Sequence, residues 1–395
     1  MNKAADRFFA TCPRGLEGAL TRELAGLGAI DAQAVGGGVA FVADWETAYR
    51  CNLWSRLATR ILYRLVEGPY QTEDDVYGLA RRVDWPQWFS QDLTIRVYVT
   101  AIKSPLKSLE YITLRIKDAV CDVFRDATGK RPSVDTREPD VRIHAFLTAD
   151  RATLYLDTSG DPLYQRGYRQ KTVDAPLKEN LAAGLLAISG WTPGQALLDP
   201  MCGSGTILLE AAMVIANIAP GGRRSFAFEL LSNFREKAWQ GLRAAEQAGR
   251  HNFQKNPPGA ALLFGRDKDP VAYRASLANF DRAGLLPLVD LKCEDVLSSK
   301  APAPQGFLVS NPPYGVRLLE DEVMAAFYPP LGHVLKKEYA GWTCCLLSAD
   351  TRLPKLIGLK PSRKTPLFNG NLECRLYEIR IVAGSNRREK PSGEA

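Results

Sequence analysis

The chain has 395 residues, which is long enough for two or three domains that each have a hydrophobic core. Its apolar fraction of 46% and charged fraction of 24% are typical of soluble globular proteins, and without an eighteen-residue apolar run or a signal-peptide pattern we expect a cytoplasmic location and no membrane partner. The formal net charge of +7 permits nucleic-acid binding without requiring it.

Residues 1–60 predict a small α+β domain. Segments 8–12 and 39–42 have the apolar character of strands, and segments 15–24 and 44–57 have that of helices. The alternation of strand and helix is the basis of this assignment.

Residues 61–165 predict a second small domain. Alternating apolar residues at 93–99 predict a strand, and the spacing over 109–124 predicts a helix with one apolar face. Basic residues in the loop between them and on the polar face of the helix are candidates for RNA contacts: Lys103, Lys107, Arg115 and Lys117. Basic loops are common on small domains, so the pattern alone also fits a solvated surface.

The second segment resembles a THUMP domain, an RNA-binding module of RNA-modifying enzymes. The similarity lies in residues 108–122, 140–143 and 156–160. It implies that RNA binds to this part of the chain.

A larger α/β domain is predicted from residue 166 onward. Arg166 and Arg169 precede a helix expected at 177–188, and Arg223 and Arg224 lie in a long segment that we interpret as an insertion beside the active site. All four are candidates for contacts with RNA phosphates, and the first two also for contact with a cofactor carboxylate. A solvated charged face is the alternative.

A glycine turn follows the first strand of this domain. The apolar residues 196–198 run into an acidic residue, and 207–213 predict a helix. Glycines at 203 and 205 let the backbone approach a ligand closely, while the acid suits an amine-bearing or cationic ligand better than a phosphate. No Gly-Lys-Ser/Thr follows, which disfavours a P-loop. The candidate cofactor-binding residues are Asp199, Pro200, Met201, Cys202, Gly203, Gly205 and Thr206.

Two later acids are candidates for the rest of a nucleoside-containing cofactor. The strand at 261–265 leads to Asp267, whose carboxylate can accept hydrogen bonds from both hydroxyls of a ribose, with Asp269 as a rival. The strand at 288–292 leads to Asp295.

The segment Ser-Asn-Pro-Pro-Tyr-Gly at 310–315 follows the apolar run 306–309. Its prolines end the strand and make a stiff turn at the carboxyl edge of the sheet. There the side-chain oxygen of Asn311 and the carbonyl of Pro312 can accept hydrogen bonds from a planar amino group, and the Tyr314 ring can stack on the base that carries it. The candidate catalytic residues are Asn311, Pro312, Pro313 and Tyr314, with Asn311 also near the cofactor. A plain turn after a strand is the alternative.

The remaining pattern completes a mostly parallel, seven-stranded sheet. A helix is expected at 322–337, a strand at 342–348, and an antiparallel strand at 374–382 that closes a hairpin. The polar residues 385–395 predict a disordered tail. Eight cysteines without a Cys-x-x-Cys pair and three scattered histidines predict reduced core thiols and no metal site.

The glycine turn and the Asn-Pro-Pro-Tyr motif, in this order, resemble those of class I S-adenosylmethionine-dependent methyltransferases that act on exocyclic amino groups. Over residues 8–382 the chain resembles the RlmL-type guanine-N2 methyltransferases of bacterial 23S rRNA, with further matches at 11–16, 54–58 and 159–161. The resemblance implies a Rossmann-like methyltransferase domain at 166–384, preceded by a ferredoxin-like domain and a THUMP domain. It also implies S-adenosylmethionine as the cofactor, with Asp295 accepting from the adenine amine.

The resemblance further implies methyl transfer to the N2 amine of a guanine in 23S rRNA by direct displacement, before or during assembly of the large subunit. Some family members carry a second methyltransferase domain that makes 7-methylguanosine. Because this sequence ends after one catalytic domain, we expect the N2 activity alone. A tRNA guanine-N2 or DNA adenine-N6 methyltransferase and a non-catalytic ribosome-assembly factor are the alternatives.

Overall fold

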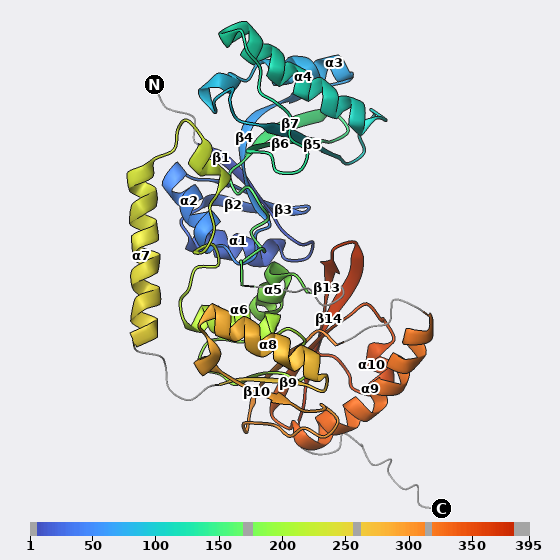
Figure 1. The fold of residues 1–395 in the computed structure, drawn as a ribbon. Helices are drawn as coiled ribbons and strands as arrows, with labels where there is room; N and C mark the ends of the chain where they lie inside the picture. The colour runs from blue at the N-terminus through green and yellow to red at the C-terminus, as the bar shows by residue number, and fades with distance from the viewer. Residues whose placement is uncertain (1–5, 169–176, 256–261, 313–317, 383–395) are drawn as a thin grey trace, which may run out of the picture. The chain divides into compact units, whose positions relative to one another are not determined.

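The computed structural model describes residues 6–168, 177–255, 262–312 and 318–382, and the tail predicted at 385–395 lies outside them. The chain forms two compact units that are not contiguous in sequence (Figure 1). Unit 1 comprises Met1–Arg169, Lys178–Gly184 and Ala216–Asn256. Unit 2 comprises Gln170–Leu177, Leu185–Ile215 and Pro257–Ala395.

Unit 1 combines a sheet with helices. Its strands are β1 (Arg7–Thr11), β2 (Ile30–Val35), β3 (Gly38–Val42), β4 (Arg60–Pro69), β5 (Ile95–Ala101), β6 (Val141–Leu147) and β7 (Arg151–Asp157). Its helices are α1 (Glu17–Gly26), α2 (Trp45–Trp54), α3 (Glu73–Arg81), α4 (Leu109–Thr128) and α7 (Glu236–Lys255), with 3-10 turns at Trp85–Gln87 and Ala227–Leu230. Helix α5 (Glu179–Ser189) begins in unit 1 and ends in unit 2.

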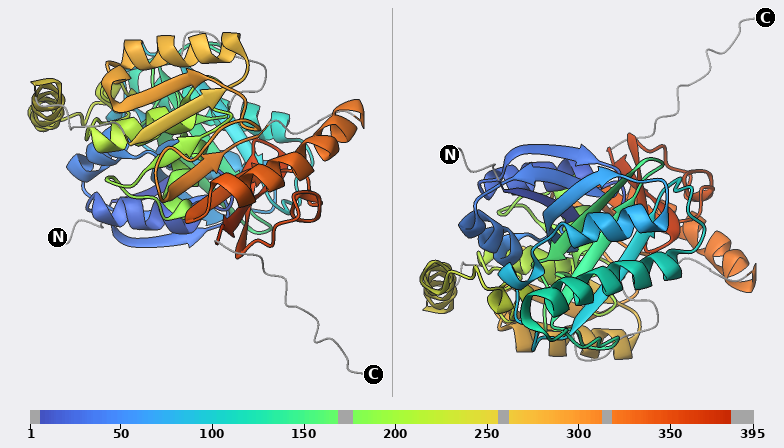
Figure 2. Two further views of the ribbon diagram at one scale, coloured as in Figure 1. Left: turned by 90° about the horizontal axis from the view of Figure 1, so that it is seen from below. Right: turned by 90° about the horizontal axis from the view of Figure 1, so that it is seen from above.

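The sheet of unit 1 has the strand order β2-β3-β1-β4-β7-β6-β5. Strand β4 pairs with β1 on one side and β7 on the other, so the domain boundary expected near residue 60 coincides with the start of a strand that both halves share. Phe8 on β1 and Leu156 on β7 both pair with Tyr63 on β4, and Leu156 also pairs with Ile143 on β6. Phe8, Leu156 and Ile143 therefore share one face of the sheet, and all three are buried. Helices α3 and α4 lie side by side over the strands (Figure 2, right). Side chains alternate along a strand, so the residues between these core positions belong to the opposite face.

Residues Ala216–Asn256 follow the first helix of unit 2 but pack in unit 1. Helix α7 contacts α2. The Phe228 ring stacks on the Tyr49 ring with centroids 4.3 Å apart, and the Trp239 ring meets Tyr49 edge-on at 6.3 Å. The segment that we interpreted as an insertion beside the active site therefore supplies aromatic core residues to unit 1.

Unit 2 is a second sheet with its own helices. Its strands are β8 (Leu197–Asp199), β9 (Leu263–Asp267), β10 (Val289–Cys293), β11 (Gly306–Ser310), β12 (Trp342–Ser348), β13 (Arg363–Asn369) and β14 (Leu372–Arg380). Its helices are α6 (Thr206–Ile215), α8 (Pro270–Ala283), α9 (Leu318–Glu338) and α10 (Leu353–Leu356), with a 3-10 turn at Leu286–Leu288.

The sheet of unit 2 has the strand order β10-β9-β8-β11-β12-β14-β13. Strands β10, β9, β8, β11 and β12 are parallel to one another, and β14 is antiparallel to both of its neighbours. This confirms the predicted mostly parallel, seven-stranded sheet with a closing hairpin. Helix α8 covers β9 and β10 (Figure 2, left). Because the strand order reverses between β8 and β11, a crevice for a ligand is expected at their carboxyl ends.

The eight cysteines all lie in the described ranges and form no disulfide there, and all except Cys293 are buried. Within the described ranges, no helix is long and apolar enough to cross a bilayer. The described residues also contain no group of three His, Cys, Asp or Glu side chains placed to hold a metal ion.

Candidate active site at the carboxyl edge of unit 2

The glycine turn connects the end of β8 to α6 and is fixed to the neighbouring strand. The backbone N–H of Cys202 donates to the Arg266 carbonyl at 2.9 Å, which ties the turn to β9. Gly203 and Gly205 have φ angles of +56° and +80°, a region that side chains disfavour. A Cβ atom at Gly205 would also lie 3.2 Å from the Ser276 hydroxyl, a tight contact that adds to the preference for glycine here.

Two residues on α8 hold the turn from the other side. The Ser276 hydroxyl donates to the Gly203 carbonyl at 2.6 Å, and the Asn279 amide donates to the Ser204 carbonyl at 3.0 Å. Neither residue was identified from the sequence. Their three-residue spacing, which places them on one face of a helix after a cofactor-binding strand, is the signal that could have found them.

Asp267 and Asp269 have different surroundings, which helps to decide between them. Asp267 Oδ2 accepts from the Gly203 N–H at 2.8 Å, and its Oδ1 accepts from the Asp269 N–H at 2.9 Å. Asp269 caps α8, because its Oδ1 accepts from the Val271 N–H at 2.8 Å and Pro270 takes the first helical turn. Capping the helix explains why Asp269 is acidic. Each carboxylate oxygen of Asp267 can accept one further hydrogen bond, so Asp267 is the better candidate for the ribose hydroxyls.

Asp199 is buried under the turn, at 2% exposure. Its Oδ1 accepts from the Ser310 hydroxyl at 2.7 Å and from the Met201 N–H at 3.3 Å. Burial, and to a lesser extent the charge of Asp267, raises the pKa of Asp199 to about 7. The Ser310 contact joins β8 to β11 and brings the glycine turn next to the start of the Asn-Pro-Pro-Tyr motif.

Asn311 directly follows Ser310 and carries an unusual acceptor. Its Oδ1 is buried and has no hydrogen-bond partner among the residues that the structure describes. A buried unpaired acceptor costs about 1–3 kcal/mol. Pro312 is buried beside it, whereas Pro313 and Tyr314 lie outside the described residues. Within the part of the chain that the structure describes, this oxygen is therefore an acceptor that an N–H group of a ligand could satisfy.

Asp295 lies beyond the end of β10 and is half-buried. Its Oδ1 accepts from the Leu297 N–H at 2.9 Å, which leaves Oδ2 for other partners. Next to it, Glu294 pairs with the buried Arg266 at 3.2 Å, and Arg266 also pairs with Asp290 at 2.9 Å. These ion pairs connect β9 to β10 and set the edge from which Asp295 projects.

The remaining cofactor candidates lie in the same turn. Pro200, Cys202 and Thr206 are buried, Met201 is partly exposed, and Thr206 is the first residue of α6. Burial raises the pKa of the Cys202 thiol, so it is a packed thiol rather than a nucleophile.

The candidates for RNA contacts in the second segment belong to unit 1. Lys103 and Lys107 are exposed in the loop between β5 and α4. On α4, Arg115 pairs with Asp74 at 2.5 Å and Lys117 pairs with Asp118, so both of these cations already have acidic partners.

Arg166 and Arg224 occupy structural positions, contrary to their prediction as phosphate contacts. Arg166 is 3% exposed and donates to the carbonyls of Leu163 and Arg56, both at 2.6 Å. The Arg224 guanidinium donates to four backbone carbonyls, those of Ser159, Asp161, Pro162 and Ser225. Because backbone carbonyls accept the hydrogen bonds of each guanidinium, neither arginine fits the predicted contact with an RNA phosphate. Arg223 is exposed, and Arg169 lies outside the described residues.

The sheet order, the glycine turn at the switch point and the motif after β11 together define a Rossmann-like methyltransferase domain. Residues 166–378 match the family model described as the RMKL-like methyltransferase domain. The chain belongs to this family. Residues 7–62 match the RlmL ferredoxin-like domain and residues 70–157 match the THUMP domain.

Known proteins agree with this classification. The chain is 39% identical over 387 residues to the ribosomal RNA large subunit methyltransferase K/L of Shewanella pealeana, covering 98% of this chain and 54% of that protein. It thus spans about half the length of the curated relatives it matches. A possible methylase from Clostridium difficile 630 superposes with a TM-score of 0.87 at 28% identity, covering 97% of this chain and 100% of that one. SMU.472, named as a methyltransferase and solved with SAH, superposes with a TM-score of 0.85 at 31% identity and the same coverage.

Proposed function

We propose that this chain transfers a methyl group from S-adenosylmethionine to the exocyclic N2 amine of a guanine in 23S rRNA. The observation that carries the proposal is that Asn311 Oδ1 is buried and has no hydrogen-bond partner among the described residues. Asn311 directly follows Ser310, whose hydroxyl donates to Asp199 at the switch point of the sheet. An acceptor at that place suits an exocyclic amino group. The name of the Shewanella pealeana relative supports large-subunit rRNA as the substrate.

The carboxyl edge of unit 2 fits S-adenosylmethionine. Gly203 and Gly205 give the methionine part of the cofactor close access to the backbone. Asp267 would accept from the ribose hydroxyls, and Asp295 from the adenine amine. The SAH bound to SMU.472 supports this site for the cofactor here. When bound, S-adenosylmethionine supplies a methyl group on a positively charged sulfonium.

Asn311 and Pro312 would position the amine. The lone pair of guanine N2 is delocalised into the ring, so the amine is a weak nucleophile. Two accepted hydrogen bonds, one at Asn311 Oδ1 and one at the Pro312 carbonyl, orient the N–H bonds and raise the electron density on N2. This is catalysis by positioning and electrostatics, and we assign no residue as a general base. The assignment of base stacking to Tyr314, and of the turn to Pro313, rests on the sequence motif.

Unit 1 would hold the RNA while the target guanine leaves its helix, at a cost of a few kcal/mol. Its match to the THUMP domain supports this role. Lys103, Lys107 and Arg223 are the exposed candidates for phosphate contacts, with Arg115 and Lys117 available through exchange of their acidic partners.

The proposal is tested by methyl transfer from labelled S-adenosylmethionine to 23S rRNA, tRNA and DNA that lack native modification, followed by nucleoside analysis. We expect label as N2-methylguanosine in 23S rRNA. Label in tRNA would keep the chemistry and change the substrate, and label as N6-methyladenine in DNA would also change the target base. No transfer to any nucleic acid, with S-adenosylmethionine bound, would contradict the proposed activity and favour the assembly-factor alternative.

A further inference from the structure

One face of the sheet in unit 1 carries a row of rings. Tyr98, His144 and Tyr155 are register partners on β5, β6 and β7, and all three are partly exposed. The His144 and Tyr98 rings stack with centroids 5.0 Å apart. Phe9 on β1 continues the row, with its ring centroid 6.0 Å from that of Tyr155. We call Phe9, Tyr155, His144 and Tyr98 the aromatic row.

Each ring of the aromatic row alternates with a buried neighbour. Phe8 next to Phe9, Leu156 next to Tyr155 and Ile143 next to His144 belong to the helix-covered core. The rings therefore lie on the face that the helices α1 to α4 leave open, because successive side chains point to opposite faces of a sheet.

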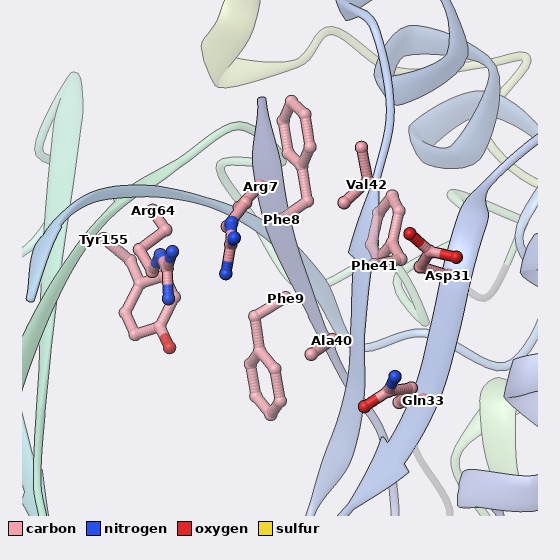
Figure 3. Close-up of a pocket in the computed structure, with 10 residues that line it drawn as sticks. All are labelled: Arg7, Phe8, Phe9, Asp31, Gln33, Ala40, Phe41, Val42, Arg64 and Tyr155. Atoms are coloured by element: carbon pink, nitrogen blue, oxygen red, sulfur yellow. The ribbon is translucent and has the colours of Figure 1, made fainter. Parts of the chain in front are cut away.

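Arginines lie beside the rings. Phe9, Tyr155, Arg7 and Arg64 line a hollow of about 310 Å³, and Figure 3 shows these four side chains gathered there. An adjoining hollow of about 500 Å³ shares Arg7 and Arg64 and adds Arg151. At the far end of the row, the Arg96 guanidinium lies 4.7 Å from the Tyr98 ring centroid.

The charges along the two hollows are balanced, with Arg7, Arg64 and Arg151 set against Asp6, Asp31 and Glu67. Glu67 pairs with Arg64 at 2.7 Å and with Arg151 at 2.6 Å, so two cations share one acid. Arg7 is exposed and forms no ion pair within the described residues. Asp31 also lines the first hollow. Such a surface favours a ligand held mainly by stacking, with a few phosphates beside it, over one held by a dense array of phosphates.

We propose that the aromatic row binds an unpaired, single-stranded segment of the RNA substrate, with bases stacked on Phe9 and Tyr155 and the adjacent phosphates at Arg7 and Arg64. A duplex hides its base faces, whereas unpaired bases can be splayed onto aromatic side chains of a sheet. Every base has a π face, so the surface holds single strands with little dependence on sequence. The inference rests on the proposed function in that it takes RNA as the substrate class.

The test is binding of the full chain to a labelled single-stranded RNA of about twelve nucleotides, measured by fluorescence anisotropy, with a duplex RNA and a single-stranded DNA of the same sequence alongside. The variants are Phe9→Ala and Tyr155→Ala, with Tyr155→Phe as the conservative change that keeps the ring. Tyr111→Ala is the matched control, because this ring is 50% exposed on α4, on the helix side of the same unit. Arg7→Glu tests the phosphate contact at a residue with no ion pair to lose among the described residues.

We expect Phe9→Ala and Tyr155→Ala each to weaken single-stranded RNA binding by about tenfold, and Tyr155→Phe and Tyr111→Ala by less than about twofold. Arg7→Glu should weaken binding and reduce its salt dependence. Unchanged melting temperatures show that the variants are folded. If an aromatic variant loses stability, the effect of Arg7→Glu on single-stranded RNA binding decides whether this face binds RNA.

Folded variants that bind single-stranded RNA as well as the native chain, or an equal loss for duplex RNA, would overturn the inference. Stronger binding to DNA than to RNA would also overturn it. This test and the test of the proposed function have separate outcomes. If N2-methylguanosine forms in 23S rRNA while the aromatic variants bind RNA normally, only the present inference is contradicted. If the aromatic variants lose RNA binding while the native chain methylates no guanine, only the proposed activity is contradicted.

Discussion

At the scale of single residues, the carboxyl edge of unit 2 keeps two polar groups in environments that cost free energy. Asn311 Oδ1 is buried without a partner among the described residues, and Asp199 is a buried acid whose pKa is raised to about 7. Such costs persist where the surrounding structure and a function maintain them. Asn311 was predictable from its motif, and Asp199 from its place after a strand. Ser310 was not singled out, because a serine before an Asn-Pro-Pro turn has no signal of its own until its partner on another strand is known.

The raised pKa of Asp199 predicts a pH dependence of stability. The ordinary value is 3.8, so between about pH 4 and pH 7 the folded chain binds more protons than the unfolded chain. The contribution of Asp199 to stability is therefore complete below about pH 4 and is lost as the pH rises through about 7. Asp199→Asn stays neutral and can still accept from Ser310. Its melting temperature relative to the native chain should rise across this window and level off above it.

Thermal melting of both chains from pH 4.5 to 8.5 measures that difference. Glu373→Gln, an exposed acid of the β13–β14 hairpin, is the matched control for loss of a carboxylate. A difference between Asp199→Asn and the native chain that does not change with pH would contradict the raised pKa.

At the scale of elements, the glycine turn is the best-determined part of the site. Its residues were predictable because the strand, turn and helix are local in sequence. Ser276 and Asn279, which hold it, lie more than seventy residues downstream, so only the three-dimensional contact of α8 with the turn reveals them. The structural roles of Arg166 and Arg224 were also hidden, since a basic residue on a loop looks the same in sequence whether it meets a phosphate or a backbone carbonyl.

Gly205→Ala should destabilise unit 2. The substitution combines a positive φ angle with a Cβ contact at 3.2 Å to Ser276 and Phe280. We expect a loss of about 2–3 kcal/mol, together with weaker S-adenosylmethionine binding. Gly370→Ala is the control, because its φ of +63° is similar and nothing lies within 4 Å of the added atom. It should cost about 1 kcal/mol. Equal losses in denaturant unfolding would show that crowding at Gly205 contributes nothing.

Arg224→Ala should lower stability rather than selectively weaken RNA binding. Its guanidinium joins the segment after α6 to the carbonyls of Ser159, Asp161 and Pro162, and burial lowers its pKa to about 10. We expect a loss of about 2 kcal/mol in unfolding free energy. The control is Arg22→Ala at an exposed position of α1, which should leave the melting temperature unchanged. A fully stable Arg224→Ala chain with weakened RNA binding would restore the phosphate-contact interpretation.

At the scale of the whole molecule, the division of the chain differs from its order in sequence. The element types and the sheet of unit 2 were predictable from periodicity and turn residues. Two features were not: β4 belongs to one sheet with strands of both N-terminal domains, and Ala216–Asn256 returns to unit 1. Both depend on long-range pairing, which a local pattern does not encode.

The return of this segment predicts the behaviour of a fragment. Residues 166–395 in isolation would leave Phe228 and Trp239 without Tyr49, on which they pack in the full chain. We expect the fragment to bind a hydrophobic dye and to associate at micromolar concentration, since it exposes a contiguous aromatic patch. The full chain is the comparison. A monomeric fragment that binds no dye and melts cooperatively would show that the segment repacks on unit 2.

The central claim is that Asn311 Oδ1 acts on the substrate amine rather than on the fold or the cofactor. The most direct measurement is the single-turnover rate of methyl transfer to unmodified 23S rRNA by Asn311→Ala, with S-adenosylmethionine affinity determined on the same protein. Asn371→Ala, in the exposed turn between β13 and β14, is the matched control. We predict that Asn311→Ala slows transfer by about 100-fold or more, with little change in cofactor affinity or melting temperature. Asn371→Ala should leave the transfer rate, the cofactor affinity and the melting temperature unchanged. Transfer at the native rate by Asn311→Ala would contradict the account.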